Sequence, residues 1–259
     1  MNARQLFFDT PRSPTPAWAK WVLGLIGALL FAAACFALLA GTTKNWESVW
    51  GYRVVFWKGW VLTVQLSAIS LVLSSFLGVV AALARRSTFL PLRGFATAYV
   101  EIVRGTPLLV LLFFLFYVVA NTAGWSDRVA VGVLALSLFS GAYIAEIVRA
   151  GISSIGESQR ESARAIGLTT AQAYRYVVFP QALRNSLPPL AGQFASIIKD
   201  SSLLSVVGAA ELTYSAQQIN SATFSTLESF LPLAIGYLVL TIPVSLAARR
   251  MEKHLVFET

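Results

Sequence analysis

Apolar residues run along this chain in long stretches that polar residues interrupt only briefly. A helix that crosses a bilayer needs about 20 predominantly apolar residues, and six stretches qualify as candidates. They are Trp18 to Ala40, Trp57 to Leu83, Thr106 to Ala120, Val129 to Val148, Leu187 to about Gly208 and Phe230 to Ala248. The pattern therefore predicts an all-α integral membrane protein with six transmembrane helices.

The first apolar stretch is interpreted as a permanent membrane anchor. A cleaved signal peptide has a short apolar core close to the N-terminus. Here a mostly polar segment, residues 1–17, comes first, and the apolar run over residues 18–40 is longer than such a core. Residues 57–249 are then expected to form the main transmembrane domain, and residues 250–259 a C-terminal tail.

Lysine and arginine residues are distributed unevenly between the apolar stretches. Cytoplasmic loops retain the positive charges of a membrane protein, and a cytoplasmic N-terminus places fifteen of the twenty basic residues inside. These are Arg4, Arg12, Lys20, Arg85, Arg86, Arg93, Arg104, Arg149, Arg160, Arg164, Arg175, Arg184, Arg249, Arg250 and Lys253. With six spans, both termini are expected to face the cytoplasm.

The composition excludes several other classes of protein. Hydrophobic residues make up 56% of the 259 residues and charged residues only 12%, whereas soluble domains carry about a quarter charged residues. The net charge of +8 comes from basic residues beside apolar runs, so lipid and topology explain it better than nucleic acid. Cys35 is the only cysteine, which excludes an internal disulfide. His254 is the only histidine and sits in the C-terminal tail, which argues against a Ser/His/Asp triad and a multi-histidine metal site.

The longest predicted cytoplasmic loop, Arg149 to Ser186, begins with the signals of a short helix. Ser158 followed three residues later by Glu161 has the spacing of a capping box, in which the two side chains bond unpaired backbone donors at a helix start. Gly167 can adopt the left-handed conformation that ends a helix. The sequence therefore predicts a helix that runs from about Ser158 to Ile166.

A second helix is predicted in the same loop after the glycine. Thr169 and Gln172 offer a second capping box, and Pro180 is expected to end the helix that they begin. The alternative interpretation is an ordinary amphipathic loop that lies on the membrane surface.

This loop resembles the EAA loop of ATP-binding-cassette (ABC) importer permeases. That motif is written EAA, three residues, G, nine residues, I, one residue, LP, and the matching residues are Glu161, Ser162, Ala163, Gly167, Val177, Phe179 and Pro180. Ser162, Val177 and Phe179 replace Ala, Ile and Leu. The resemblance implies that the segment around Ser158 to Leu168 is a coupling helix that docks in a groove on an ATPase subunit.

Four further stretches resemble elements of the polar amino-acid permeases in this family. Thr63 to Gly78 resembles the opening core helix, Arg104 to Leu108 the RGTPL element, Ala142 to Arg149 the AYxAExxR element, and Lys199 to Leu203 the KxTSL element. Such permeases carry glutamate, aspartate, glutamine, histidine or arginine. The resemblance covers the chain from about Gly59 to Ala248 and implies a five-helix type I importer core that follows one extra helix.

The resemblance also implies the partners of the chain. No GxxxxGK[ST] phosphate loop occurs in the sequence, so ATP and magnesium are expected on a separate polypeptide. The implied assembly has two cytoplasmic ATPase subunits, an extracytoplasmic binding protein and a second permease chain, identical or related, in a bacterial inner membrane. A membrane-embedded enzyme is the first alternative, but the carboxylates here are scattered along the chain. A channel or structural subunit is the second, and it would leave the capped loop without a role.

Glu146 is a carboxylate at membrane depth near the cytoplasmic end of the fourth stretch. A charge there costs a few kcal/mol unless it faces protein, water or a partner. Arg149 lies three residues further on the same helical face, so a structural ion pair competes with a role in transport.

Two further groups are candidates for the substrate pathway. Lys199, Asp200, Ser201 and Ser202 place consecutive polar groups in the fifth stretch, as expected where a broken helix lines a substrate cavity. Such a break can hold both ends of an amino-acid zwitterion, whereas the alternative is a Lys199–Asp200 pair that fixes helix packing. Arg104 stands at the start of the third stretch, either as a positive-inside anchor or as a contact near the ATPase or a gate.

Overall fold

The computed structural model describes residues 16–39 and 45–255. The predicted N-terminal segment with Arg4 and Arg12 lies mostly outside these residues, and so does the side chain of His254. The chain divides into two compact units, Met1–Asn45 and Trp46–Thr259. The first unit contains helix α2 (Ala17–Leu39), which confirms that the first apolar stretch is helical.

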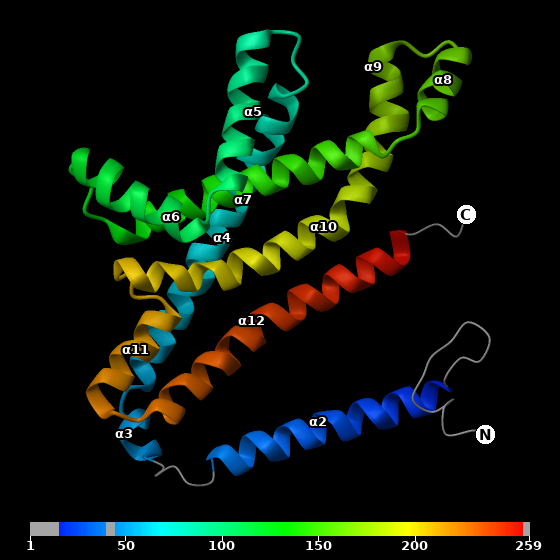
Figure 1. Cartoon of the computed structure of the whole chain (residues 1–259). Coiled ribbons are helices and arrows are strands. Elements are labelled where there is room, and N and C mark those ends of the chain that lie inside the picture. Colours follow the sequence, from blue (N-terminus) through cyan, green and yellow to red (C-terminus); the bar gives the residue numbers. More distant parts are fainter. Residues whose placement is uncertain (1–15, 40–44, 256–259) are drawn as a thin grey trace. The chain divides into compact units, whose positions relative to one another are not determined.

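The second unit is built from helices, and the described residues contain no strand (Figure 1). In chain order these are α3 (Trp46–Trp50), α4 (Arg53–Ala84), α5 (Leu90–Gly105), α6 (Leu108–Phe113), the π-helix η1 (Phe114–Ala120), α7 (Arg128–Ser153), α8 (Glu157–Ala165), α9 (Thr170–Ala173), the π-helix η2 (Tyr174–Val178), α10 (Phe179–Asp200), the 3₁₀-helix η3 (Ser201–Val207), α11 (Leu212–Thr223) and α12 (Thr226–Leu255). The predicted all-α class is confirmed.

Among the described residues, three helices are long and apolar enough to cross a membrane: Arg53–Ala84, Arg128–Ser153 and Thr226–Met251. A fourth candidate is the pair Leu90–Gly105 and Leu108–Ala120, which bends by 111° at its break. The predicted third span, Thr106 to Ala120, matches the helical stretch Leu108–Ala120 to within two residues. Pro107 has no backbone N–H to continue a helix, and Thr106 before it is extended, so the apolar run is the second half of a bent pair.

Helices α4 and α7 pack closely because small residues face each other along their contact. A Cβ atom on Gly78 would lie 2.5 Å from Ile144 Cγ2 and 2.9 Å from the carbonyl oxygen of Gly141. Ser70 and Ser74 of α4 are also fully buried. Small side chains let helix backbones approach within a membrane protein, and these two helices form the centre of the second unit.

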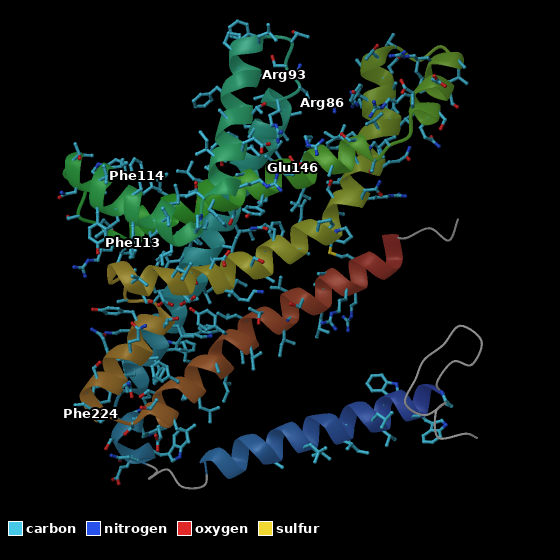
Figure 2. The ribbon with its side chains drawn as sticks, viewed as in Figure 1. Arg86, Arg93, Phe113, Phe114, Glu146 and Phe224 are labelled. Carbon is cyan, nitrogen blue, oxygen red and sulfur yellow. The ribbon has the colours of Figure 1, made fainter. Side chains whose placement is uncertain are left out.

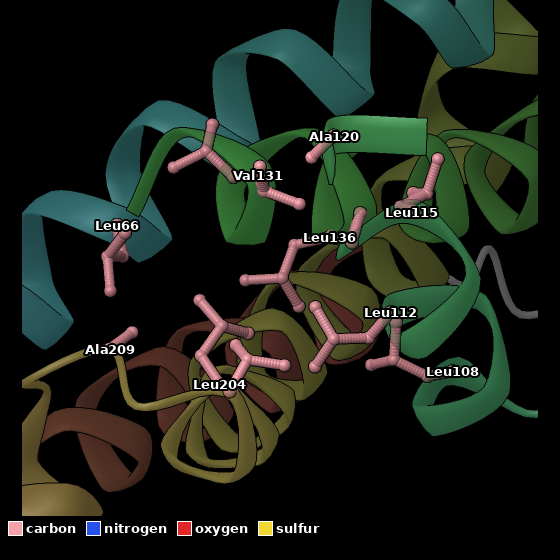
Figure 3. Close-up of a cluster of buried hydrophobic side chains, with 12 residues drawn as sticks. Leu66, Leu108, Leu112, Leu115, Ala120, Val131, Leu136, Leu204 and Ala209 are labelled. Atoms are coloured by element: carbon pink, nitrogen blue, oxygen red, sulfur yellow. The ribbon is translucent and has the colours of Figure 1, made fainter. Parts of the chain in front are cut away.

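A cluster of buried leucines joins this centre to η3 (Figure 3). Leu66 of α4, Leu112 of α6, Leu136 of α7 and Leu204 of η3 are all at most 1% exposed. Gly132 of α7 makes room for Leu204, because a Cβ atom there would lie 2.7 Å from Leu204 Cγ. The polar residues that precede Leu204 are thereby held in a fixed position beside α4 and α7.

Candidate functional site

The α8–α9 loop lies at the end of the second unit that is remote from α3 and α11 (Figure 1). Helix α8 begins after Gly156, which caps it without a side-chain hydrogen bond. The predicted capping box of Ser158 and Glu161 is therefore wrong. Helix α8 starts one residue earlier than expected, so Ser158 already lies in its first turn.

The end of α8 follows the prediction. Gly167 is left-handed with φ +84°, its amide donates to the carbonyl of Arg164 at 2.9 Å, and the Leu168 amide donates to Ala163 at 3.1 Å. These two bonds form a Schellman motif, which pairs carbonyls that a helix end leaves free. Ser158, Glu161, Ser162 and Ala163 lie on α8, and Gly167 and Leu168 follow it.

The second predicted capping box is present at the start of α9. The Thr169 amide donates to Gln172 Oε1 at 2.9 Å, and the Gln172 amide donates to Thr169 Oγ1 at 3.3 Å. Pro180, however, does not end the helix. The chain continues through η2, which contains Val177, into α10, where Pro180 occupies the first turn. A first-turn proline lacks only a backbone donor that the helix start does not need.

Several contacts hold this loop to the bundle. Ile155, Val178 and Ala182 form a small buried cluster, and the Arg160 guanidinium donates to the Ile152 carbonyl at 3.1 Å. Arg86, in the turn after α4, donates to Tyr174 Oη at 2.6 Å. The Arg86 guanidinium also lies 5.7 Å from the centre of the Tyr174 ring, so the loop is tied to the turn between α4 and α5.

One face of the loop stays open to contact. Ile166 is 76% exposed and Tyr176 is 63% exposed. Ala163, in contrast, is only 3% exposed and packs inward. The exposed side chains of Ile166 and Tyr176 are available for contact with another protein.

Glu146 of α7 lies at the centre of a charged cluster (Figure 2). Its Oε2 atom accepts from Arg85 Nη1 at 2.9 Å and from Arg149 Nε at 3.0 Å, and Arg104 Nη1 lies 3.8 Å away. Glu101 of α5 also contacts Arg85, at 3.4 Å. The predicted pair with Arg149 is present. The pairing with Arg85 was not predicted, because 61 residues separate the partners.

The Glu146 cluster joins three helices next to the α5–α6 bend. Arg85 caps the end of α4, Arg104 lies in the last turn of α5, and Arg149 belongs to α7. The Arg104 guanidinium also lies 5.4 Å from the centre of the Tyr143 ring. Three cations around Glu146 neutralise its charge, and a rearrangement of either neighbouring helix must separate some of these pairs.

The polar residues of the predicted fifth span lie where α10 becomes η3. Lys199 and Asp200 end α10, and Ser201 and Ser202 begin the tighter 3₁₀ turns. Ser201 Oγ donates to the Ile198 carbonyl at 2.8 Å, which ties the hydroxyl to the preceding turn. The expected interruption is thus a change from α to 3₁₀ geometry that continues to the left-handed Gly208.

The two predicted pathway groups are not brought together. Leu204, just after the serines, packs beside Leu136 of α7. Glu146 lies ten residues beyond Leu136 on the same helix, which corresponds to about 15 Å. Arg104 accompanies Glu146, so the candidates form one charged group near the α5–α6 bend and one group at the α10–η3 junction.

Sequence reasoning missed a buried carboxylate, Glu211, beside α11. The side chain is fully buried and accepts from the Thr213 amide at 2.9 Å, the Tyr214 amide at 2.8 Å and Tyr237 Oη at 2.9 Å. Burial raises the pKa of Glu211, while the hydrogen bonds from the two amides lower it. An acidic residue directly before a helix, as here, is the signal for such a cap.

The Glu211 network also reaches α4. Thr63 Oγ1 accepts from the Leu212 amide at 3.0 Å, across 149 residues of sequence. Thr213 Oγ1 and Tyr237 Oη lie 2.9 Å apart. The segment from Glu211 to Tyr214, at the start of α11, therefore contacts both α4 and the middle of α12.

These features define an all-helical membrane subunit with an anchored loop at one end and polar junctions inside the bundle. Residues 74–256 match the family described as binding-protein-dependent transport system inner membrane component. This match spans well over half of the chain, so the chain belongs to that family. It is a permease subunit of an ABC importer, in which ATP hydrolysis lies in a separate subunit.

Similar proteins extend over most of the chain. The glutamine transport system permease protein GlnP of Escherichia coli (strain K12) is 34% identical over 213 residues, which cover 82% of this chain and 97% of that protein. The L-cystine transport system permease protein TcyB of Bacillus subtilis (strain 168) is 37% identical over 224 residues, 85% of this chain and 94% of that protein.

A solved structure supports the type I importer fold. The crystal structure of an amino acid ABC transporter with histidines contains a chain that is 35% identical, with a TM-score of 0.77. The match covers 82% of this chain and all of that chain.

Proposed function

We propose that this chain lines the pathway by which an ABC importer takes up a polar amino acid. The observation that carries the proposal is the α8–α9 loop, in which a Schellman motif and a capping box hold two short helices in a fixed geometry. The relatives described above, which transport glutamine and cystine, support the substrate class. The assembly would contain two ATPase subunits, a second permease chain and an extracytoplasmic binding protein.

The proposed orientation places both termini and the α8–α9 loop in the cytoplasm of a bacterial inner membrane. The uneven distribution of basic residues supports this orientation. Arg160, Arg164 and Arg175 all lie on the loop, whereas the segment from Ala209 to Ser229 contains no basic residue.

The docking role is proposed for Ser158, Glu161, Ser162, Ala163, Gly167, Leu168, Val177 and Pro180. The exposed Ile166 and the residues around it would enter a groove on the ATPase. Buried Ala163 would instead keep α8 against the rest of the loop. Closure of the ATPase subunits would displace this loop as a unit, because its internal hydrogen bonds leave it little freedom.

The Arg86–Tyr174 contact offers a route from the loop to the bundle. Arg85, next to Arg86, binds Glu146, and Arg104 lies beside the same carboxylate at the end of α5. A movement of Tyr174 would therefore be transmitted to the α5–α6 bend through Arg86 and Arg85, which are adjacent in the sequence. In this mechanism, Glu146 and Arg104 would form an ion pair near the cytoplasmic side, where the substrate leaves the pathway.

Substrate contact is proposed for Lys199, Asp200, Ser201 and Ser202. The Lys199 ammonium and the Asp200 carboxylate can meet the two charged ends of an amino acid, and Ser201 and Ser202 add hydroxyl groups. Replacing Lys199 and Asp200 separately by alanine should impair uptake while the ATPase stays bound. Unchanged uptake in both variants would remove these residues from the pathway.

Cysteine cross-linking tests the docking role. In a Cys35→Ser background, Ile166→Cys should cross-link to a co-expressed ATPase subunit in membranes, because Ile166 is 76% exposed. Phe224→Cys, which is 90% exposed beyond α11, is the matched control and should not react with the ATPase. Uptake of radiolabelled amino acids by the same membranes would identify the substrate. No cross-link from any exposed position of the loop would contradict the proposal.

A further inference from the structure

A cavity of about 500 Å³ lies between α3, the first turn of α4 and α12. Its lining is almost entirely apolar, with Trp46, Val49, Trp50, Phe56 and Pro232 as walls. Two charged residues, Glu47 and Arg53, complete the lining. The cavity lies at the end of the second unit that is remote from the α8–α9 loop, so it is separate from the sites described above (Figure 1).

The surroundings of the cavity are apolar and exposed. Helices α4 and α12 are both apolar enough to span a membrane, and the most apolar stretch of α12 has none of its residues buried within the chain. Leu231 and Ile235 near the cavity are 42% and 51% exposed. Trp46, Trp50 and Trp57 are also exposed, and tryptophan gathers at the level of lipid headgroups. The cavity is thus placed where a headgroup meets its acyl chains.

The lining offers a binding partner for each part of a zwitterionic phospholipid. An acyl chain fits the indole and phenyl walls, because these exclude water without requiring hydrogen bonds. The Arg53 guanidinium matches a phosphate, which it binds through several N–H donors. One of these, Nη1, donates to the Trp50 carbonyl at 3.2 Å, and this bond orients the guanidinium. The Glu47 carboxylate, an acceptor only, matches a primary ammonium group.

We propose that this cavity binds a phosphatidylethanolamine-type lipid, with an acyl chain between the tryptophans, the phosphate at Arg53 and the ammonium at Glu47. An anionic lipid without an ammonium group would leave Glu47 without its partner. A choline headgroup carries no N–H donor for that carboxylate. The lipid would fill the space between α3 and the starts of α4 and α12, and it would so stabilise this end of the bundle.

Photolabelling tests the site in the full-length chain reconstituted into phosphatidylcholine liposomes. Tracer amounts of phosphatidylethanolamine, phosphatidylglycerol or phosphatidylcholine, each with a diazirine on the acyl chain, are activated, and labelled peptides are located by mass spectrometry. The ethanolamine probe should label residues 46–56 at least about threefold more than the other two probes, the ratio expected for one modest charge-assisted contact. Labelling of Val72, Leu73 and Phe76 of α4, which are exposed and apolar, should not depend on the headgroup.

Substitutions of the two charged residues separate this proposal from general lipid contact. Glu47→Gln should abolish the threefold preference, whereas Arg53→Gln should lower the labelling of residues 46–56 by all three probes, because each of them carries the phosphate. Neither change should alter gel filtration, because both side chains are exposed. Arg93→Gln, at an exposed arginine near the start of α5 (Figure 2), is the matched control and should retain the preference. Equal labelling of residues 46–56 by all three probes would overturn the proposal. A preference that survives Glu47→Gln, or labelling that Arg53→Gln leaves unchanged for all three probes, would also overturn it.

Discussion

Glu146 of α7 lies beside the ends of α4 and α5, whereas Glu211 caps α11 and contacts α12, and the two carboxylates are held in opposite ways. Glu146 retains 23% side-chain exposure and is surrounded by arginine guanidinium groups. Glu211 is fully buried and accepts hydrogen bonds from two backbone amides and from the Tyr237 hydroxyl, all of which are neutral. Water can solvate the ions of the first cluster when they separate, whereas it cannot reach the second.

This difference indicates which end of the bundle can rearrange. An ion pair at partial exposure breaks and re-forms at modest cost, so the Glu146 junction suits an element that moves during transport. A buried carboxylate with several fixed donors costs far more to disturb. We therefore expect the Glu211 end to act as a fixed support.

The largest effect is expected for Glu211→Ala. It would leave two backbone amides unpaired, would take the Glu211 acceptor away from the Tyr237 hydroxyl and would remove the cap of α11, at a cost of roughly 3 kcal/mol in stability. The thermal unfolding midpoint of the purified chain in detergent should fall clearly. Glu157→Ala, at an exposed position of α8, should leave the midpoint nearly unchanged. Equal midpoints for the two variants would refute the support role.

Glu146→Gln should mainly affect transport. An amide cannot balance the charges of Arg85, Arg104 and Arg149, so uptake by the reconstituted importer should fall about tenfold, or 1.4 kcal/mol. The chain should still fold, because the arginines retain access to water. Glu101→Gln is the control, since this carboxylate is 62% exposed and contacts Arg85 at 3.4 Å. Comparable losses from both variants would show that Glu146 has no special role.

Glu211→Gln should reveal a pH dependence. Burial raises the pKa of Glu211, so the folded state favours the protonated carboxyl. The stability that it contributes is fully present below the ordinary carboxyl pKa of about 4.3 and is lost as the pH rises through the raised value. Relative to the glutamine variant, the wild-type chain should therefore lose stability as the pH increases. Thermal unfolding measured from pH 4.5 to 8 tests this, and parallel curves would contradict it.

Tyr174→Phe should have a smaller effect. It removes the hydroxyl that accepts from Arg86 at 2.6 Å but keeps the ring beneath the guanidinium. The loss of about 1 kcal/mol should lower the amount of amino acid transported per ATP about fivefold, with little change in ATP hydrolysis. Tyr176→Phe, whose ring contacts Arg175 at 5.6 Å, is the matched control. Proportional losses of transport and hydrolysis would assign Tyr174 to ATPase docking instead.

The smallest effect is expected at Phe224, which ends α11. Its φ of 52° lies in the left-handed region, and its side chain is 90% exposed. Glycine adopts this conformation without the clash of a Cβ atom, so Phe224→Gly should raise stability by about 0.5–1 kcal/mol. A small increase in the unfolding midpoint would be the result. A decrease would mean that the phenyl ring makes a contact worth more than the strain.

Local signals in the sequence predicted part of the site well. Gly167 and the pair Thr169 and Gln172 follow rules that involve only neighbouring residues, and both predictions are confirmed. The Ser158 prediction failed because Gly156 provided an earlier start that has no side-chain signal. The Pro180 prediction failed because the preceding π turn let the helix continue.

Contacts between distant segments could not be predicted from spacing. The ion pair of Glu146 with Arg85 depends on how α4 packs against α7, and the burial of Glu211 depends on Tyr237, 26 residues away. Only the Arg149 partner, three residues from Glu146, was visible in the sequence. The bend between α5 and α6 also needed the structure, although Pro107 was a signal for it.

The close packing at Gly78 has a consequence for the transport cycle. Because a Cβ atom there would collide with Ile144 and with the backbone at Gly141, the surfaces of α4 and α7 interlock and cannot slide along each other. Helices α4 and α7 must therefore move together as one rigid unit. When the pathway changes the side of the membrane to which it opens, the bending must therefore occur elsewhere. The candidates are the α5–α6 bend and α10, which contains Pro188 and Pro189.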